Sequence, residues 1–145
     1  MLGFNAHQRY MIYKECVDMR KGVYGLCGLI INELKENPSN GTVYVFFSKS
    51  YQTVKILVWD KDGFVVYGKW LSQGRFENVQ SVIDGKAGEL SYQYLIMLLS
   101  GVSLIGAKQR LRYQLKATSS WSRKARKKVK NIIKKSMYNV GIKVE

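Results

Sequence analysis

Short apolar runs separated by turn signals predict four β-strands in the first half of the chain. The runs are rich in aromatic and β-branched residues, and the turns between them contain Gly, Asn, Asp and Ser. The third and fourth strands should form a hairpin around Asp60-Lys61-Asp62-Gly63, with Gly63 at the positive-φ corner. The predicted strands cover residues 9–13, 42–47, 53–59 and 64–71.

Between the first two predicted strands, apolar residues recur at three- and four-residue spacing, which indicates an amphipathic helix from Met19 to Lys35. Asp18 is expected to cap this helix, because its carboxylate can accept the free backbone N–H groups of the first turn. Three glycines inside the helix each cost it about 1 kcal/mol relative to Ala. They are Gly22, Gly25 and Gly28. We therefore expect the helix to approach another backbone closely, that of the sheet.

The hairpin pattern predicts a sheet with two apolar faces. If Trp59 pairs with Phe64, one face carries Lys55, Leu57 and Trp70, and the alternate residues of both strands form the other face. Both faces must then be covered. The helix at 19–35 would cover one of them, and a later helix or a partner chain would cover the other.

That later helix is predicted at 92–100, with Ser91 as its cap, and residues 72–88 before it are expected to be mostly loop. Together these elements predict an α+β fold, an antiparallel β-meander sheet with packed helices and a basic C-terminal helix or arm.

The formal net charge is +14, and most of it lies in the last quarter of the chain. Residues 1–107 hold 11 Lys and Arg against 9 Asp and Glu, whereas residues 108–145 hold 13 against 1. We therefore expect an α+β core domain at 1–107 and a basic C-terminal extension at 108–145. Within the extension, the pattern indicates a strand or extended arm at 108–115, a hinge at 117–120 and a third helix at 122–138.

This uneven distribution of charge along the chain indicates a polyanionic partner, because a bound polyanion would relieve the repulsion between the cations of the extension. We favour contacts of Lys and Arg with the phosphates of DNA or RNA. The alternatives are binding to an anionic membrane surface and a charged extension that binds nothing. Such contacts give sequence-independent, salt-sensitive affinity. The candidate nucleic-acid-binding residues are Arg20, Lys21, Arg75, Lys108, Arg110, Arg112, Arg123, Lys124, Arg126, Lys127, Lys128, Lys130, Lys134 and Lys135.

Arg20 and Lys21 are notable because cations in the first turn of a helix oppose its dipole. A phosphate bound at the helix N-terminus would compensate for this repulsion. A salt bridge to Asp18 or to the hairpin carboxylates is the alternative.

Catalytic chemistry is not indicated. The single histidine, His7, leaves a nucleophile without a well-placed base, and no phosphate-binding Gly-rich loop is present. Asp60 and Asp62 resemble the start of a calcium loop, but the twelfth position, which requires Glu, is Leu71. The two cysteines lack the spacing of a zinc pair. We therefore expect no catalytic residue, no metal, no cofactor and no enzyme activity.

The start of the chain lacks the pattern of a secretory signal, and the longest apolar stretch, 94–107, is too short to span a membrane. We therefore expect a cytoplasmic, nucleoid-associated protein without a membrane partner.

A series of short motifs resembles the small accessory protein, often labelled TnpB, that insertion sequences of the IS-sixty-six type encode in their second open reading frame. The resemblance covers about Arg9 to Gly101. The motifs, in order, are Asp18-Met19-Arg20-Lys21-Gly22, Gly25-Leu26, Asn40-Gly41, Val45-Phe46-Phe47, the segment from Val54 to Phe64, Lys69-Trp70-Leu71, Gly74-Arg75-Phe76 and Leu98-Leu99 before Gly101.

The resemblance implies a protein that is needed for transposition beside a separate, larger transposase, and it assigns no catalytic residues. Two positions depart from the family pattern. Ser48-Lys49-Ser50-Tyr51 stands where members carry an Arg-rich turn, and Val58 stands where a Trp is common. The first departure weakens any role of that turn in gripping DNA.

We therefore expect a non-catalytic, DNA-associated accessory factor in transposition, whose basic extension contacts the backbone of the transposon DNA and whose protein partner is the transposase of the same element. Two other functions remain open. One is a module that assembles the transposase through protein contacts, with no direct role in DNA binding. The other is a nuclease or strand-transfer enzyme that uses Asp60 and Asp62. The sequence does not decide between DNA and RNA, and it leaves open whether the chain forms an oligomer.

Overall fold

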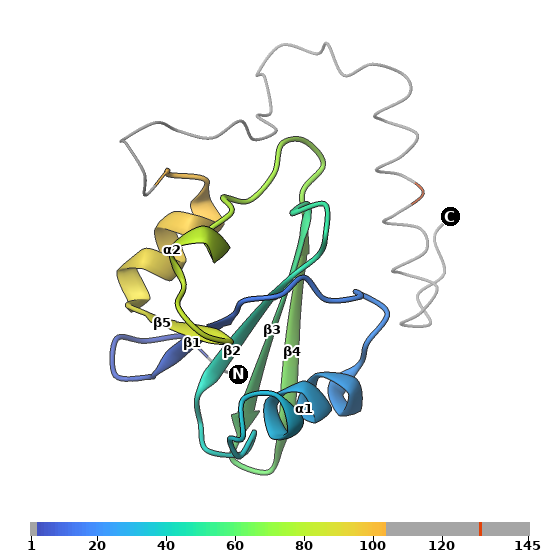
Figure 1. Cartoon of the computed structure of the whole chain (residues 1–145), viewed down its shortest axis with the longest axis vertical. Coiled ribbons are helices and arrows are strands. Elements are labelled where there is room, and N and C mark those ends of the chain that lie inside the picture. The colour runs from blue at the N-terminus through green and yellow to red at the C-terminus, as the bar shows by residue number, and fades with distance from the viewer. Residues whose placement is uncertain (1–2, 104–130, 132–145) are drawn as a thin grey trace, which may run out of the picture. The chain divides into compact units, whose positions relative to one another are not determined.

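The computed structural model describes residues 3–103 and Asn131, and its main feature is a mixed β-sheet flanked by helices (Figure 1). The strand order in this five-stranded sheet is β4-β3-β2-β1-β5. The elements are β1 (Tyr10–Tyr13), α1 (Val23–Asn32), β2 (Val43–Phe47), β3 (Thr53–Asp60), β4 (Gly63–Trp70), a short 3-10 helix η1 (Gln80–Val82), β5 (Ala87–Leu90) and α2 (Tyr92–Ser100).

The predicted antiparallel meander is correct for β2, β3 and β4 but wrong for β1. β1 runs parallel to β2, with Met11 opposite Tyr44, because α1 carries the chain back across the sheet before β2 begins. β5 was not predicted. Its first two residues fall at the end of the predicted loop at 72–88, and it pairs antiparallel with β1, with Met11 opposite Glu89. β4 and β5 therefore form the two edges of the sheet.

The β3–β4 hairpin has the predicted register. Trp59 lies opposite Phe64, and their rings meet edge to face with centroids 4.9 Å apart. The predicted positive φ at Gly63 is wrong. Gly63 already pairs with Asp60 as a strand residue, and the left-handed residue is Lys61, at a φ of 49°.

α1 is shorter than predicted, since it begins at Val23 and ends at Asn32. Gly22 is its N-cap and supplies no side-chain hydrogen bond, so the predicted cap at Asp18 is wrong. The expected close approach of the glycines to the sheet is also wrong. A Cβ on Gly22 or Gly28 would meet nothing within 4 Å, and one on Gly25 would meet only the Lys21 side chain, at 3.1 Å.

Each face of the sheet carries its own apolar core. On one face, Leu26, Cys27 and Ile30 of α1 pack with sheet residues such as Tyr44 and Leu57. On the other face, a second cluster joins sheet residues to α2 and to the segment after β4. This cluster includes Val45, Phe47, Ile56, Phe76, Leu95 and Leu98. Burying each large apolar side chain contributes about 1.5–3 kcal/mol. The two-sided sheet is confirmed, and α2 is the helix on the second face.

α2 has the predicted bounds and cap. The Ser91 side chain accepts a hydrogen bond of 3.2 Å from the Tyr94 N–H, and the helix ends at Gly101, whose φ is 84°. Lys69 of β4 donates a hydrogen bond of 3.0 Å to the Leu99 carbonyl oxygen near the C-terminus of α2. This bond connects the edge strand with the second helix and places a cation at the negative end of the helix dipole.

The predicted elements of the basic extension, at 108–115, 117–120 and 122–138, lie outside the described residues, except for Asn131.

Candidate nucleic-acid interface

The segment between β1 and α1 carries two of the candidate cations. It leaves the sheet at the carboxyl ends of β1 and β2, where the Val17 N–H donates a hydrogen bond of 2.8 Å to the Phe47 carbonyl oxygen. The buried Val17 side chain packs in the core on the α1 side. This anchor fixes the start of the segment, so that Arg20 and Lys21 lie directly before the N-terminus of α1.

Arg20 forms the salt bridge to Asp18 that the sequence offered as one alternative. Its Nη2 lies 2.7 Å from Oδ2 of Asp18, and Oδ1 of Asp18 accepts a bond of 2.9 Å from the Arg20 backbone N–H. The side-chain hydrogen bonds from Arg20 lower the pKa of Asp18 to about 2. The carboxylate therefore binds Arg20 and is not the cap of α1. The guanidinium remains largely exposed.

Lys21 lies beside Lys55, a cation from the sheet. The Lys55 Nζ donates a hydrogen bond of 2.8 Å to the Lys21 carbonyl oxygen, so the Lys55 ammonium lies against the backbone just before α1. The first turn of α1 contains no acidic residue, and Gly22 leaves the first N–H groups without a side-chain cap. This end of α1 is therefore electropositive, through both the helix dipole and the neighbouring lysines.

Arg75 lies on a different segment, one that covers the opposite face of the sheet. Two backbone hydrogen bonds tie that segment to the β2–β3 turn: Leu71 N–H to the Gln52 oxygen at 2.8 Å, and Phe76 N–H to the Tyr51 oxygen at 2.7 Å. Phe76 is buried against Phe47 on the α2 side, and Arg75 is exposed. The structure therefore brings Arg20 and Lys21 together but places Arg75 on a segment of the other face.

The remaining candidate cations lie outside the described residues. They are Lys108, Arg110, Arg112, Arg123, Lys124, Arg126, Lys127, Lys128, Lys130, Lys134 and Lys135. Their contact with nucleic acid stays a prediction.

Lys55 is not among the candidate cations predicted from the sequence. The alternation of β3 placed it on the same face as Leu57, but α1 was expected to begin at Met19, which put the Lys21 carbonyl inside a helix. Once α1 begins at Val23, that carbonyl is free to accept the Lys55 ammonium. A lysine on an otherwise apolar strand face was the available signal.

The side chains considered for metal or thiol chemistry do not converge. Within residues 3–103, no three His, Cys, Asp or Glu side chains are grouped so that they could hold a metal ion. Asp60 and Asp62 lie at the tip of the β3–β4 hairpin. Both cysteines are free thiols. Cys16 is exposed, and Cys27 is buried against the sheet, which raises the pKa of its thiol.

The described part of the chain contains no helix with both the length and the apolar character needed to cross a membrane.

Residues 8–109 of this chain match a family of proteins encoded by insertion sequences, and this match defines the class of the protein. The chain belongs to the family described as IS66 Orf2 like protein. The resemblance drawn from the short motifs is therefore confirmed. Most of the basic extension lies beyond the matched residues.

Two proteins of Sinorhizobium fredii (strain NBRC 101917 / NGR234) are similar to this chain. The "Uncharacterized protein y4jC" is 30% identical over 110 residues, which cover 76% of this chain and 92% of that protein. The "Uncharacterized protein y4hO" is 33% identical over 102 residues, which cover 70% and 87%. No solved structure matches the chain.

Proposed function

We propose that this insertion-sequence protein is a non-catalytic accessory factor that associates with DNA through the basic residues of its C-terminal extension. The observation that carries this proposal is the charge distribution, in which residues 108–145 hold 13 Lys and Arg against 1 acidic residue. Such a segment neutralises phosphates and releases their counterions, which provides affinity without reading a sequence. The core, with 11 cations against 9 acids, would contribute far less of this affinity.

The start of α1 supports a secondary contact from the core. Lys21, Lys55 and the uncapped first turn of α1 present positive charge on one side of the sheet. A phosphate near this point would meet both an ammonium group and the helix dipole. The Asp18 carboxylate offsets the charge of Arg20, so we assign the larger share of this contact to the two lysines.

The test is salt-dependent binding of duplex and single-stranded DNA by the full chain and by a truncated chain that ends at Ala107. We expect the full chain to bind more tightly at about 50 mM salt, and its advantage to fall steeply as salt rises. Equal affinity of the two chains would contradict the proposal. A divalent-metal cleavage assay tests the non-catalytic part, since cleavage that disappears when Asp60 and Asp62 are both changed to Ala would contradict it.

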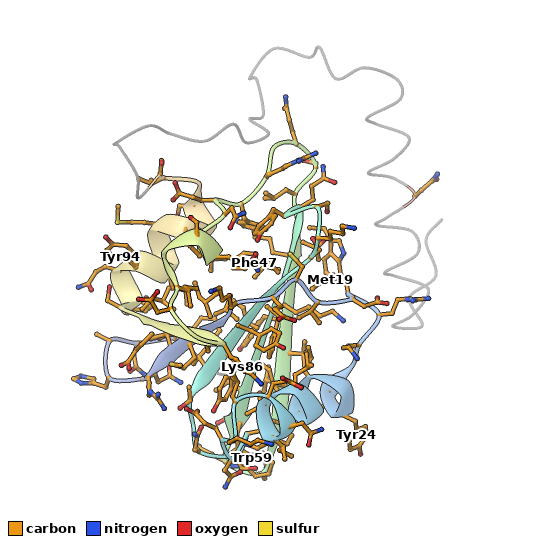
Figure 2. The ribbon with its side chains drawn as sticks, viewed as in Figure 1. Met19, Tyr24, Phe47, Trp59, Lys86 and Tyr94 are labelled. Atoms are coloured by element: carbon orange, nitrogen blue, oxygen red, sulfur yellow. The ribbon has the colours of Figure 1, made fainter. Side chains whose placement is uncertain are left out.

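A second candidate function, assembly of the transposase through protein contacts alone, is favoured by the outer surface of α2. Tyr94, Ile96 and Met97 are exposed there, although they are apolar. Figure 2 shows Tyr94 pointing away from the sheet. This function predicts a transposase complex that survives both deletion of the extension and nuclease treatment, in a chain with no affinity for DNA.

A further inference from the structure

The last residue of β4, Trp70, holds its ring over a glycine and remains exposed. Trp70 and Gly68 lie on the same face of this edge strand, because they are two residues apart. A Cβ on Gly68 would lie only 2.6 Å from Cη2 and 2.7 Å from Cζ3 of Trp70, so the indole occupies the space where a side chain would stand. Even so, 66% of Trp70 is accessible to solvent.

The residue next to this ring on the neighbouring strand is Lys55, which also contacts the start of α1. Lys55 of β3 lies directly opposite Gly68 in the sheet, so the indole that covers Gly68 lies beside the Lys55 stem. The Lys55 Nζ in turn reaches the Lys21 carbonyl oxygen. Lys21 itself is exposed, and the neighbouring Arg20 is paired with Asp18. An exposed indole and two ammonium groups therefore belong to one side of the sheet.

An exposed aromatic ring beside cations suits an unpaired nucleobase. Single-stranded nucleic acid is bound by aromatic rings on which bases stack, together with positive charges that follow the phosphates. A base in the interior of a duplex has both of its ring faces stacked already, so a single strand offers the indole far more accessible bases than a duplex does. Lys21 and Lys55 supply the charge complementary to such a ligand at this site, and the net charge of the whole chain, +14, favours a polyanion over a basic protein partner.

We propose that Trp70, Lys55 and Lys21 form a stacking site for single-stranded DNA, in which a base lies on the indole and the adjacent phosphate meets the lysines. This inference rests on the proposed association with DNA and goes beyond it, because it assigns a site on the core and a preference for unpaired bases. The basic extension supplies general affinity, and the Trp70 site distinguishes single strands from duplex.

The experiment compares the full chain with the full-length Trp70→Ala variant, using a short oligothymidine and a duplex of the same length at about 50 mM salt. We expect Trp70→Ala to bind the oligothymidine about fivefold or more weakly, since stacking of a base on an aromatic side chain is worth about that much or more. Its duplex affinity should be unchanged. Tyr94→Ala is the matched control, since it removes an exposed aromatic ring from the opposite side of the sheet.

Two further variants separate stacking from folding. Gly68→Ala keeps the Trp70 indole, but the added methyl group would displace the ring from its place over residue 68. We expect this variant to bind oligothymidine as weakly as Trp70→Ala does. A chain with Trp59→Phe and Trp121→Phe keeps Trp70 as its one tryptophan, and we expect oligothymidine to quench its fluorescence. Circular dichroism tests whether each variant is folded.

The possible outcomes separate failure of the stacking site from failure of the proposed DNA association. Unchanged oligothymidine affinity in Trp70→Ala, or no quenching of Trp70, overturns the stacking site while duplex binding by the full chain leaves the proposed function intact. Loss of transposase binding in Trp70→Ala without loss of oligothymidine binding also overturns it, in favour of a protein contact. A full chain that binds neither DNA form contradicts both the site and the proposed function.

Discussion

The Lys55 ammonium donates a hydrogen bond of 2.8 Å to the Lys21 carbonyl oxygen, and this bond joins the middle of β3 to the segment that leads into α1. The carbonyl accepts this bond because it precedes the helix. The same contact places the Lys55 ammonium beside the N-terminus of α1, where the backbone N–H groups of the first turn add to its field.

Changing Lys55 to Met removes this bond and keeps most of the side-chain stem. We expect the free energy of unfolding to fall by about 0.5–1.5 kcal/mol, the usual net contribution of one hydrogen bond. Chemical denaturation measures the change. Lys49→Met, on the exposed β2–β3 turn, is the control and should lie within about 0.5 kcal/mol of the unchanged protein. Equal effects of the two substitutions would show that the bond contributes nothing.

The Asp18–Arg20 pair gives a pH prediction. Hydrogen bonds from Arg20 hold the pKa of Asp18 at about 2, below its ordinary value of 3.8. Because the folded-state pKa is lowered, the stabilisation is present above the ordinary value and is lost as pH falls through about 2. Arg20→Gln should raise the pKa of Asp18 towards 3.8, as carboxyl chemical shifts in an NMR titration would show.

Lys86→Gln is the control for that titration, because Lys86 pairs with Glu33 and not with Asp18. A pKa for Asp18 that is the same in Arg20→Gln as in the unchanged chain would contradict the pairing.

Tyr44 gives the corresponding prediction at high pH. Its buried hydroxyl donates a hydrogen bond of 2.6 Å to Glu36, and burial together with this bond raises the pKa of Tyr44 from 10.0 to about 12. A raised folded-state pKa means that the stabilisation is present below pH 10.0 and is lost as pH rises through about 12. Tyr44→Phe should remove this loss and lower the free energy of unfolding at neutral pH by about 1–2 kcal/mol.

Tyr24→Phe serves as the control for Tyr44→Phe, since Tyr24 is 93% exposed and projects from α1 (Figure 2). It should leave stability unchanged at both pH values. An equal loss in the two variants would show that the buried hydrogen bond to Glu36 does not stabilise the fold.

Substitutions in α2 test whether this helix stabilises the fold by covering the second face of the sheet. Leu95 is fully buried against the sheet, so Leu95→Ala should lower the free energy of unfolding by about 2–5 kcal/mol. Ile96, the next residue, is 40% exposed, and Ile96→Ala should cost less than about 1 kcal/mol. Thermal unfolding measures both. A small loss in Leu95→Ala would mean that α2 does not close this face.

Local signals in the sequence were sufficient for some elements. The pairing of Trp59 with Phe64 follows from a short turn between alternating strands, and Ser91 marks the start of α2 because its hydroxyl can bind a first-turn N–H. The confirmed two-sided sheet followed from apolar residues on both faces of the hairpin. These features depend on residues close together in the chain.

Features that depend on distant residues were missed. β5, Ala87-Gly88-Glu89-Leu90, carries little strand signal and is defined by its pairing with β1, more than seventy positions earlier in the chain. Asp18 accepts hydrogen bonds from Arg20 and does not cap α1, although the sequence around Asp18 is compatible with either arrangement. Lys55 could not be assigned to the interface from the sequence, because the Lys21 carbonyl oxygen can accept its hydrogen bond only when α1 begins after Lys21.

The most direct test of DNA association measures the affinity of the full-length chain for DNA at increasing salt, beside a full-length variant with a neutralised extension. The variant changes eight cations to Gln, namely Arg123, Lys124, Arg126, Lys127, Lys128, Lys130, Lys134 and Lys135. We predict a steep linear fall of log affinity with log salt for the unchanged chain, with most of that slope and of the affinity at about 50 mM salt lost in the variant. The same affinity and slope in both chains would contradict the account.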